Sequence, residues 1–329
     1  MQELRFPRCR RHNFSKIVTT LPQESWIMML KTDLPVPAPV SPTFGTGRRR
    51  PGRVDMVDPN LIPLLRTPVS AGSQSQASPL SRRSGRCQAC HSPEQIFPFT
   101  MAFQPIVDVQ ESRIDAYEAL VRGPDGEGAG QMLAQVNAGN VYTFDQACRV
   151  KAIEMAARLG MDRQLNINFL PNAVYEPRAC IRATLDAAAR TGFNPKRLTF
   201  EIVETETIVD TPHLLNIIGE YRRQGFKTAL DDFATGYSGL ARLAELKPDI
   251  VKLDRALAQD CDKDRTRLAI IASMIALGAQ IDIKVVVEGV ERRSEVDALR
   301  SVGARFIQGF YFAKPSFERL CRDETVFSF

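Results

Sequence analysis

The sequence has no apolar run that approaches the roughly 20 residues needed to span a bilayer. Near the start, residues 17–35 are interrupted by Pro22, Glu24 and Lys31, so we expect no secretion signal. Cysteine is also sparse, because seven unevenly spaced thiols exclude a secreted disulfide scaffold and fit a reducing compartment. These absences predict a cytoplasmic protein with no membrane partner.

Charge and proline divide the chain into two parts. Residues 1–97 carry a net charge of +8 and 12 of the 21 prolines, whereas residues 98–329 carry a net charge of −3. The first part has few large apolar side chains, so it cannot bury enough surface to offset its chain entropy. We expect a basic, largely disordered segment over residues 1–96, a folded domain over residues 97–322 and a tail over residues 323–329.

The role of the first part stays open. Its GRRR run at residues 47–50 is compatible with contact to nucleic acid or an acidic surface, but we favour a solvated tail and expect no nucleic-acid partner. Cys87, Cys90 and His91 form a CxxCH pattern. This pattern is compatible with c-type haem attachment, half of a zinc site or a redox pair, and we favour an unliganded linker.

From Thr100 onward, apolar runs of strand length alternate with segments of helical period. This alternation favours parallel strands joined by right-handed crossovers, and eight strands favour a (β/α) barrel over a small doubly wound sheet. Helical spacing is found at residues 144–159, 181–189, 214–221 and 268–277. The predicted strands are residues 101–107, 114–121, 165–170, 198–203, 228–231, 250–253, 284–287 and 306–307.

Polar side chains appear near the carboxyl ends of these apolar runs, on the face that points into a barrel. Catalytic groups gather at that rim, and carboxylates crowded there repel one another unless divalent cations neutralise them. Oxygen ligands favour Mg²⁺, Mn²⁺ or Ca²⁺ over zinc, and an adjacent Asp-Asp pair can bridge two ions, which suits phosphodiester hydrolysis. The polar residues are Glu118, Asn168, Glu201, Asp231, Asp232, Lys252, Glu288 and Gln308.

Each of these residues taken alone is also compatible with a cap or a surface charge. Glu204 and Glu291 are typical of surface charges on spacing alone. The ensemble favours a site, because six successive predicted strands end in an acid, an amide or an amine.

The order of motifs from residue 97 to residue 317 resembles the EAL domain of cyclic di-GMP phosphodiesterases. The name-giving tripeptide is Glu118-Ala119-Leu120. The motifs are FQPIV at 103–107, YEALVR at 117–122, NINFLP at 166–171, FEIVE at 200–204, DDFATGYSGL at 231–240, DIVKLD at 249–254, VEGVE at 287–291 and QGF at 308–310.

The resemblance implies a modified TIM (β/α)8 barrel whose first strand is antiparallel to the others. It implies metal-dependent hydrolysis of cyclic di-GMP to linear pGpG, with Mg²⁺ or Mn²⁺ as the two cations and Ca²⁺ as an inhibitor. It also implies a homodimer formed through this domain.

The same resemblance assigns roles to residues by motif position. One metal is held by Glu118, Asn168, Glu201 and Asp231. Asp231 and Asp232 hold the second metal, and Glu288 assists through water.

Lys252 contacts or deprotonates the attacking water, and two facing cations are expected to lower its pKa. Arg122 holds a substrate phosphate, Gln104 and Gln308 line the guanine or water side, and Glu204 anchors the loop after the Asp pair.

Three positions depart from the family pattern. Ala234 replaces a glycine in the loop after the Asp pair, which costs about 1 kcal/mol if the position needs a positive φ. Gly239 stands where serine is common, and Val287 replaces an alanine. The alternative function is therefore a catalytically weak or inactive domain that acts as a cyclic di-GMP receptor or a protein-interaction module.

Overall fold

The structure, a computed structural model, describes residues 96–327 except 138, 175, 204–210 and 234–238. The basic segment with its CxxCH pattern, Glu204 and Ala234 lie outside the described residues. Among the helices that are described, none combines the length and the apolar composition that crossing a membrane requires.

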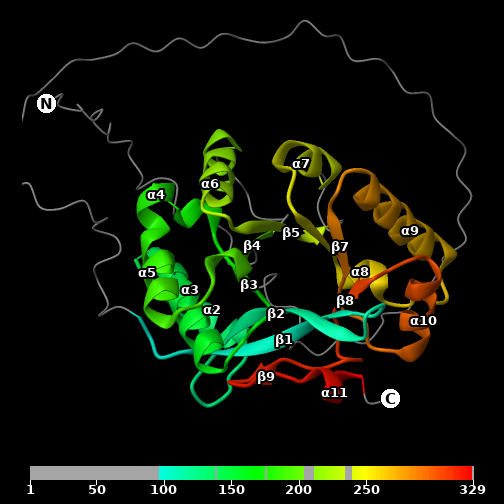
Figure 1. Cartoon of the computed structure of the whole chain (residues 1–329), viewed down its shortest axis with the longest axis horizontal. Helices are drawn as coiled ribbons and strands as arrows, with labels where there is room; N and C mark the ends of the chain where they lie inside the picture. Colours follow the sequence, from blue (N-terminus) through cyan, green and yellow to red (C-terminus); the bar gives the residue numbers. More distant parts are fainter. Residues whose placement is uncertain (1–95, 138, 175, 204–210, 234–238, 328–329) are drawn as a thin grey trace, which may run out of the picture. The chain divides into compact units, whose positions relative to one another are not determined.

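The eight predicted strands are present and close into one barrel (Figure 1). Strand β1 pairs in antiparallel fashion with β2 and with β8, whereas the successive pairs from β2 to β8 are parallel. The α/β modified TIM barrel with an antiparallel first strand is therefore confirmed. The strands are β1 (Thr100–Asp108), β2 (Arg113–Arg122), β3 (Gln164–Asn168), β4 (Leu198–Val203), β5 (Lys227–Phe233), β6 (Ile250–Leu253), β7 (Lys284–Val287) and β8 (Phe306–Ile307).

A small apolar cluster fills the inside of the barrel, and we call it the floor. Its buried members are Ile106, Ala116, Ala229, Ile250 and Val286, with Phe306 packed against them. Successive side chains of a strand point to opposite faces, so the residues two positions away from floor residues also point inward. The outward-facing strand residues belong to a second, larger core that they share with the helices.

Helices surround the barrel and pack their apolar stripes against the outer face of the strands (Figure 1). The four predicted helices are confirmed as α3, α5, α6 and α9, and the additional helices are mostly short. The helices are α2 (Ala129–Leu133), α3 (Val141–Arg158), α4 (Pro177–Cys180), α5 (Arg182–Thr191), α6 (Thr211–Arg223), α7 (Gly239–Leu246), α8 (Arg255–Ala258), α9 (Arg265–Gln280), α10 (Arg293–Ser301) and α11 (Asp323–Val326).

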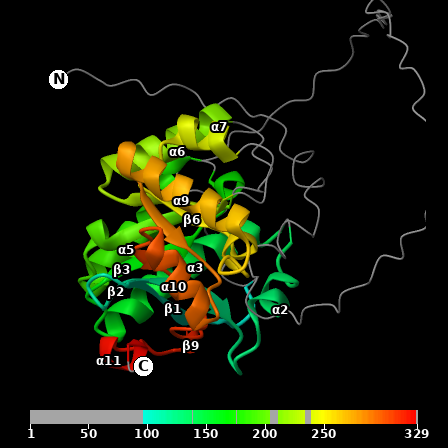
Figure 2. The same ribbon diagram turned by 90° about the vertical axis from the view of Figure 1, so that its right-hand side faces the viewer.

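The C-terminal residues complete the barrel wall beside β1. Strand β8 pairs with β1 only near Val107, and a ninth strand, β9 (Ser316–Phe317), pairs with β1 at Ala102 and Phe103. Figures 1 and 2 show β9 and α11 next to β1. The side chain of Val326 in α11 is fully buried, so at least part of the expected tail 323–329 packs with the domain.

A buried ion pair braces the outer face of β3 and β4. Arg149 of α3 is fully buried, pairs with Asp145 and donates to the Tyr221 hydroxyl at 2.9 Å. Its guanidinium carbon lies 5.4 Å from the ring centroid of Phe169 and 5.6 Å from that of Phe200. These two rings follow Asn168 and precede Glu201 in the sequence, so the packing is adjacent to two candidate metal ligands.

Candidate active site

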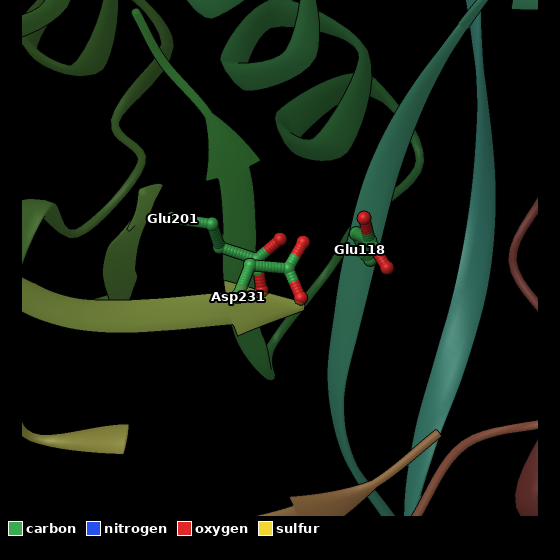
Figure 3. Close-up of side chains that lie close together, drawn as sticks. All are labelled: Glu118, Glu201 and Asp231. Carbon is green, nitrogen blue, oxygen red and sulfur yellow. The ribbon is translucent and has the colours of Figure 1, made fainter. Parts of the chain in front are cut away.

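The carboxylates of Glu118, Glu201 and Asp231 point toward one another in the mouth of the barrel (Figure 3). One oxygen of each lies within 4.8 Å of the others. Asp231, Asp232 and Glu288 form a second group that meets the same limit. Because Asp231 belongs to both groups, the two potential cation positions are adjacent.

The tilt of the barrel strands brings the carboxylate and amide residues of β2 to β5 to the same level along the barrel axis. Glu118 pairs in register with Asn166, and Asn168 pairs with Glu201. The register continues with Val203 opposite Asp231. Residues that advance along successive strands of a tilted barrel lie at the same level along its axis. The polar ends of β2 to β5 therefore converge, as their positions in the sequence predicted.

A local distortion turns both aspartates of the Asp-Asp pair toward the mouth. Alternation alone would send Asp231 inward and Asp232 outward. The pairing of β5 with β6 shifts register between Leu230 and Phe233, and Asp232 has a φ of 54°. Aspartate adopts this left-handed conformation more readily than most residues. The Asp232 amide also donates to Asp231 Oδ1 at 2.9 Å, which holds the bend.

Lys252 of β6 lies at the centre of the carboxylates. Its Nζ is 2.8 Å from Glu288 Oε1, 3.0 Å from Glu201 Oε1, 3.2 Å from Asp231 Oδ1 and 3.4 Å from Glu118 Oε2. The side chain is 1% exposed. One ammonium therefore faces four acids, which leaves the group with an excess of negative charge when all are ionised.

The four acids set the pKa of Lys252 when no cation lies beside them. Burial lowers this pKa, but the neighbouring acids, with Asp231 and Glu118 first, outweigh burial and raise it well above 10.5. The protein's own groups therefore keep Lys252 protonated. The lowered pKa that we expect of a lysine facing two cations concerns the cation-bound site and stays a prediction.

The pKa values of the four acids around Lys252 are shifted in different directions. Burial raises the pKa of Glu201 and of Glu288 well above 4.5, although Lys252 acts in the opposite direction. Burial raises the pKa of Asp231 as well. For Glu118, burial is outweighed by Lys252 and by hydrogen bonds, so its pKa lies below 4.5. Binding of a cation to these acids would therefore release protons.

Amide side chains hold Glu118 from both sides. Asn168 Nδ2 donates to Glu118 Oε1 at 3.1 Å, and Gln308 Nε2 donates to Glu118 Oε2 at 2.8 Å. Gln308 Nε2 also lies 3.2 Å from Gln104 Oε1, and Gln104 Nε2 donates to the Ala313 carbonyl at 3.2 Å. The two glutamines that we expected on the guanine or water side thus form a chain that fixes Glu118.

The donor set fits hard divalent cations. Within the described residues, Asn168 Oδ1 is buried and has no hydrogen-bond partner, while the amide nitrogen of the same side chain is engaged by Glu118. A buried carbonyl oxygen without a partner costs about 1–3 kcal/mol, and a cation bound beside Glu118 would remove that cost. The surrounding ligands are all oxygens, as Mg²⁺ and Mn²⁺ prefer.

A third group of acids provides a contrast. Asp260, Asp262 and Glu295 also meet the distance limit, but Arg292 occupies the position between them. Its guanidinium lies 2.9 Å from Asp260, 2.8 Å from Asp262 and 2.8 Å from Glu295. Arg292, together with Lys263 at 3.0 Å from Asp260, offsets part of this negative charge, and we assign the group to the structure of the α8–α10 region.

Two other expected site residues are placed as follows. Arg122 is the last residue of β2, lies on the same inward face as Glu118 and is 6% exposed. Its guanidinium donates to the carbonyl of the preceding residue, Val121, at 2.8 Å. Glu204 lies outside the described residues.

One contact was not expected from the sequence: Asn166 Nδ2 donates to Glu201 Oε1 at 2.7 Å. Period-two alternation puts Asn166 on the same face as Asn168, and this is the sequence signal that could have pointed to it.

Two glycines permit close contacts just beyond the ends of β7 and β8, one between these two ends and one with α8. A Cβ on Gly309 would lie 2.0 Å from the Val290 carbonyl oxygen. Gly289 has a φ of 70°, and a Cβ there would meet Arg255 at 2.4 Å. Both glycines follow a site residue directly, so the backbone approach that they allow sets the positions of Glu288 and Gln308.

Comparison with protein families identifies this arrangement. The family model described as "EAL domain" matches residues 97–315. The chain belongs to the EAL domain family. Among solved structures, the c-di-GMP-bound form of a standalone EAL protein from Vibrio cholerae O395 has a TM-score of 0.66 and 46% identity. That match covers 69% of this chain and 95% of the Vibrio chain.

Two further relatives of this EAL chain differ in what their names state. A manganese/cy-diGMP complex of BlrP1 from Klebsiella pneumoniae has a TM-score of 0.65 and 35% identity, over 69% of this chain and 58% of BlrP1. BluF of Escherichia coli K12 is named a blue light- and temperature-regulated antirepressor. It is 30% identical over 214 residues, which are 65% of this chain and 53% of BluF. The chain thus spans about half of BluF and a smaller share of several other relatives.

Proposed function

We propose that this EAL chain hydrolyses one phosphodiester bond of cyclic di-GMP and releases linear pGpG, with two divalent cations as cofactors. The observation that carries the proposal is the oxygen cage of the barrel mouth, where no expected ligand is replaced by an apolar side chain. The c-di-GMP-bound Vibrio structure and the manganese/cy-diGMP complex of BlrP1 support the same ligand and the same kind of cation.

Glu118, Asn168, Glu201 and Asp231 would hold one cation, and Asp231 and Asp232 the other. When bound, the cations polarise the phosphoryl oxygens and lower the pKa of the attacking water. The preference for Mg²⁺ or Mn²⁺, with Ca²⁺ as an inhibitor, is part of the proposal.

The chain's own residues supply positioning and charge. Gln308 and Asn168 fix the two oxygens of Glu118, so this carboxylate enters the reaction already oriented. Arg122, on the inward face of β2, supplies a positive charge for a substrate phosphate. Lys252, held among its four acids, would contact the attacking water and orient it, or take its proton once the cations occupy the site.

The test is incubation of the full chain with cyclic di-GMP and Mn²⁺ or Mg²⁺, followed by chromatography for pGpG. We expect turnover that is abolished by a chelator and reduced at least about 100-fold by Glu118→Ala, which removes a ligand and its charge. The same assay on residues 96–329 reports the effect of the basic segment. Absence of turnover at micromolar protein, with Glu118→Ala behaving identically, would contradict the proposal.

A second candidate function follows from the name of BluF. BluF, which is 30% identical to this chain, is named an antirepressor, which is a regulatory role. The second candidate is therefore a cyclic di-GMP receptor or protein-interaction module with weak or no turnover. Calorimetry with cyclic di-GMP distinguishes the two: binding without pGpG formation supports the receptor, and rapid turnover excludes it as the primary role.

Oligomeric state and domain organisation belong to the same proposal. We propose a homodimer formed through the EAL domain, a folded domain that begins near residue 97, and a basic segment 1–96 with no catalytic residue. Light scattering on the full chain, with and without Mn²⁺ and cyclic di-GMP, tests the dimer.

A further inference from the structure

Two polar residues interrupt the apolar floor of the barrel. On β2, β5, β6 and β7, the residue two positions before the site residue is Ala116, Ala229, Ile250 or Val286. On β3 and β4 the same positions hold Asn166 and Thr199. Asn166 is 1% exposed and Thr199 is fully buried. Burial of an amide costs free energy unless it gains a hydrogen bond, so the Asn166 amide needs a partner.

That partner is a candidate metal ligand. Asn166 Nδ2 donates to Glu201 Oε1 at 2.7 Å, and the Glu201 side chain is fully buried. In the described part of the chain, the carbonyl oxygen of Asn166 has no partner. An ionised Glu201, the form that binds a cation, accepts at both oxygens, so the Asn166 nitrogen is the group that faces it. The hydrogen bond of this side chain is therefore committed to Glu201.

Asn166 restricts the orientation of the Glu201 carboxylate, whereas Lys252 does not. The Lys252 ammonium lies 3.0 Å from Oε1 and 3.1 Å from Oε2 of Glu201, and it also faces three other acids. A charge shared among four carboxylates does not select the orientation of one. Asn166 contacts Oε1 only, and it does so from a floor position two residues before Asn168.

We infer that Asn166 is a positioning residue that orients the Glu201 carboxylate for the cation shared with Glu118, Asn168 and Asp231. The inference rests on the proposed function and deepens it. Residues that hydrogen-bond metal ligands typically change metal affinity 10–100-fold when they are lost. We therefore expect Asn166 to act on metal affinity more than on the fold.

The test measures Mn²⁺ binding to the full chain without nucleotide, by the electron paramagnetic resonance signal of free Mn²⁺. Asn166→Ala removes the donor, and Asn166→Ser replaces it with a hydroxyl too short to reach Glu201. Thr199→Val is the matched control, because Thr199 is paired in register with Asn166 and its buried hydroxyl has no partner in the described region. Thermal unfolding of each variant is recorded in parallel.

We expect both Asn166 variants to raise the Mn²⁺ dissociation constant at least about tenfold, and Thr199→Val to change it less than about twofold. Saturating Mn²⁺ should restore most of the kcat of the Asn166 variants, which a purely structural defect would not allow. Unchanged affinity in Asn166→Ala, or an equal loss in Thr199→Val, would overturn the inference. Failure of both Asn166 variants to fold would also overturn it, since Asn166 would then be required for the stability of the barrel.

The outcome is separable from that of the proposed function. A wild-type chain that binds Mn²⁺ but does not hydrolyse cyclic di-GMP refutes the function and leaves the Asn166 comparison valid. A chain that hydrolyses cyclic di-GMP while Asn166→Ala binds Mn²⁺ normally refutes the inference alone.

Discussion

At the scale of single residues, Asp232 shows how the backbone serves the site. Two adjacent strand residues point to opposite faces, so an Asp-Asp pair presents only one carboxylate to the mouth of a regular barrel. The register shift after Leu230 and the φ of 54° at Asp232 allow both to face the mouth. The residue must therefore be both a ligand and tolerant of the left-handed conformation, and aspartate and asparagine meet the second requirement.

This dual requirement predicts different results for two substitutions of Asp232. Asp232→Asn should keep the melting temperature within about 2 °C but lower hydrolysis at least about tenfold, since it removes a ligand charge and not the backbone preference. Asp232→Val should in addition lose about 1–2 kcal/mol of stability, because a β-branched residue is strained at this φ. Thermal unfolding and pGpG formation measure the two effects.

Equal melting temperatures for the two Asp232 variants would contradict the conformational argument. Undiminished hydrolysis by Asp232→Asn would contradict the ligand role.

At the scale of elements, the C-terminal residues act as part of the barrel wall. The family match ends at residue 315, yet β9 and α11 lie beyond it and contact β1 and β2. The Tyr117 hydroxyl donates to the Cys321 carbonyl at 2.6 Å, and the Ile114 amide donates to Asp323 Oδ1 at 2.7 Å. Because Tyr117 precedes Glu118, these contacts hold the strand that carries the first ligand.

The contact of Asp323 predicts a selective effect on stability. Asp323→Ala leaves the Ile114 amide without its acceptor and should cost about 1 kcal/mol, or a melting temperature lower by about 2–4 °C. Asp323→Asn keeps an acceptor oxygen and should lose less than half as much. Calorimetric unfolding of both variants makes the comparison, and an equal loss would show that the charge of Asp323 matters more than its hydrogen bond.

At the scale of the whole molecule, charge separates the domain from its basic segment. Residues 98–329 carry a net charge of −3, and several of their acids meet in the barrel mouth. Two divalent cations would add four positive charges at that point, which favours an anionic dinucleotide. The net charge of +8 on residues 1–97 is a separate property of the chain.

The same crowding predicts a pH dependence for the metal-free protein. The folded-state pKa values of Glu201 and Glu288 lie well above the ordinary value of 4.5, so the folded protein binds more protons than the unfolded chain above pH 4.5. Stability from these groups is therefore present below pH 4.5 and lost as pH rises through their raised pKa values. Cations bind the ionised ligands, so their stabilising effect should grow with pH.

We expect the increase in melting temperature on adding Mn²⁺ to be larger at pH 8 than at pH 5.5. We also expect proton release on binding, seen by calorimetry as a dependence of the heat on the ionisation enthalpy of the buffer. Glu201→Gln should weaken both effects. An increase that is independent of pH, with no proton release, would contradict the assignment of these acids as cation ligands.

Much of the fold and the inventory of the candidate site could be predicted from the sequence, because both depend on local periodicity. Glu118, Glu201 and Lys252 each follow an apolar strand run at an inward position, so period two and strand order suffice to group them. The antiparallel direction of β1 was implied by the resemblance to the EAL domain family and not by periodicity. The short strand β9 and helix α11 were missed, since two to four residues carry too little periodicity to predict.

Sequence alone determined most of the residues that line the barrel mouth, because the chain order of strands and the alternation of side chains are set by the chain itself. Only the tertiary structure decided how those residues interact. The bend that turns Asp232 inward, the bond from Asn166 to Glu201 and the raised pKa of Lys252 all depend on distances between separate strands. These distances arise from barrel tilt and burial, which no local pattern specifies.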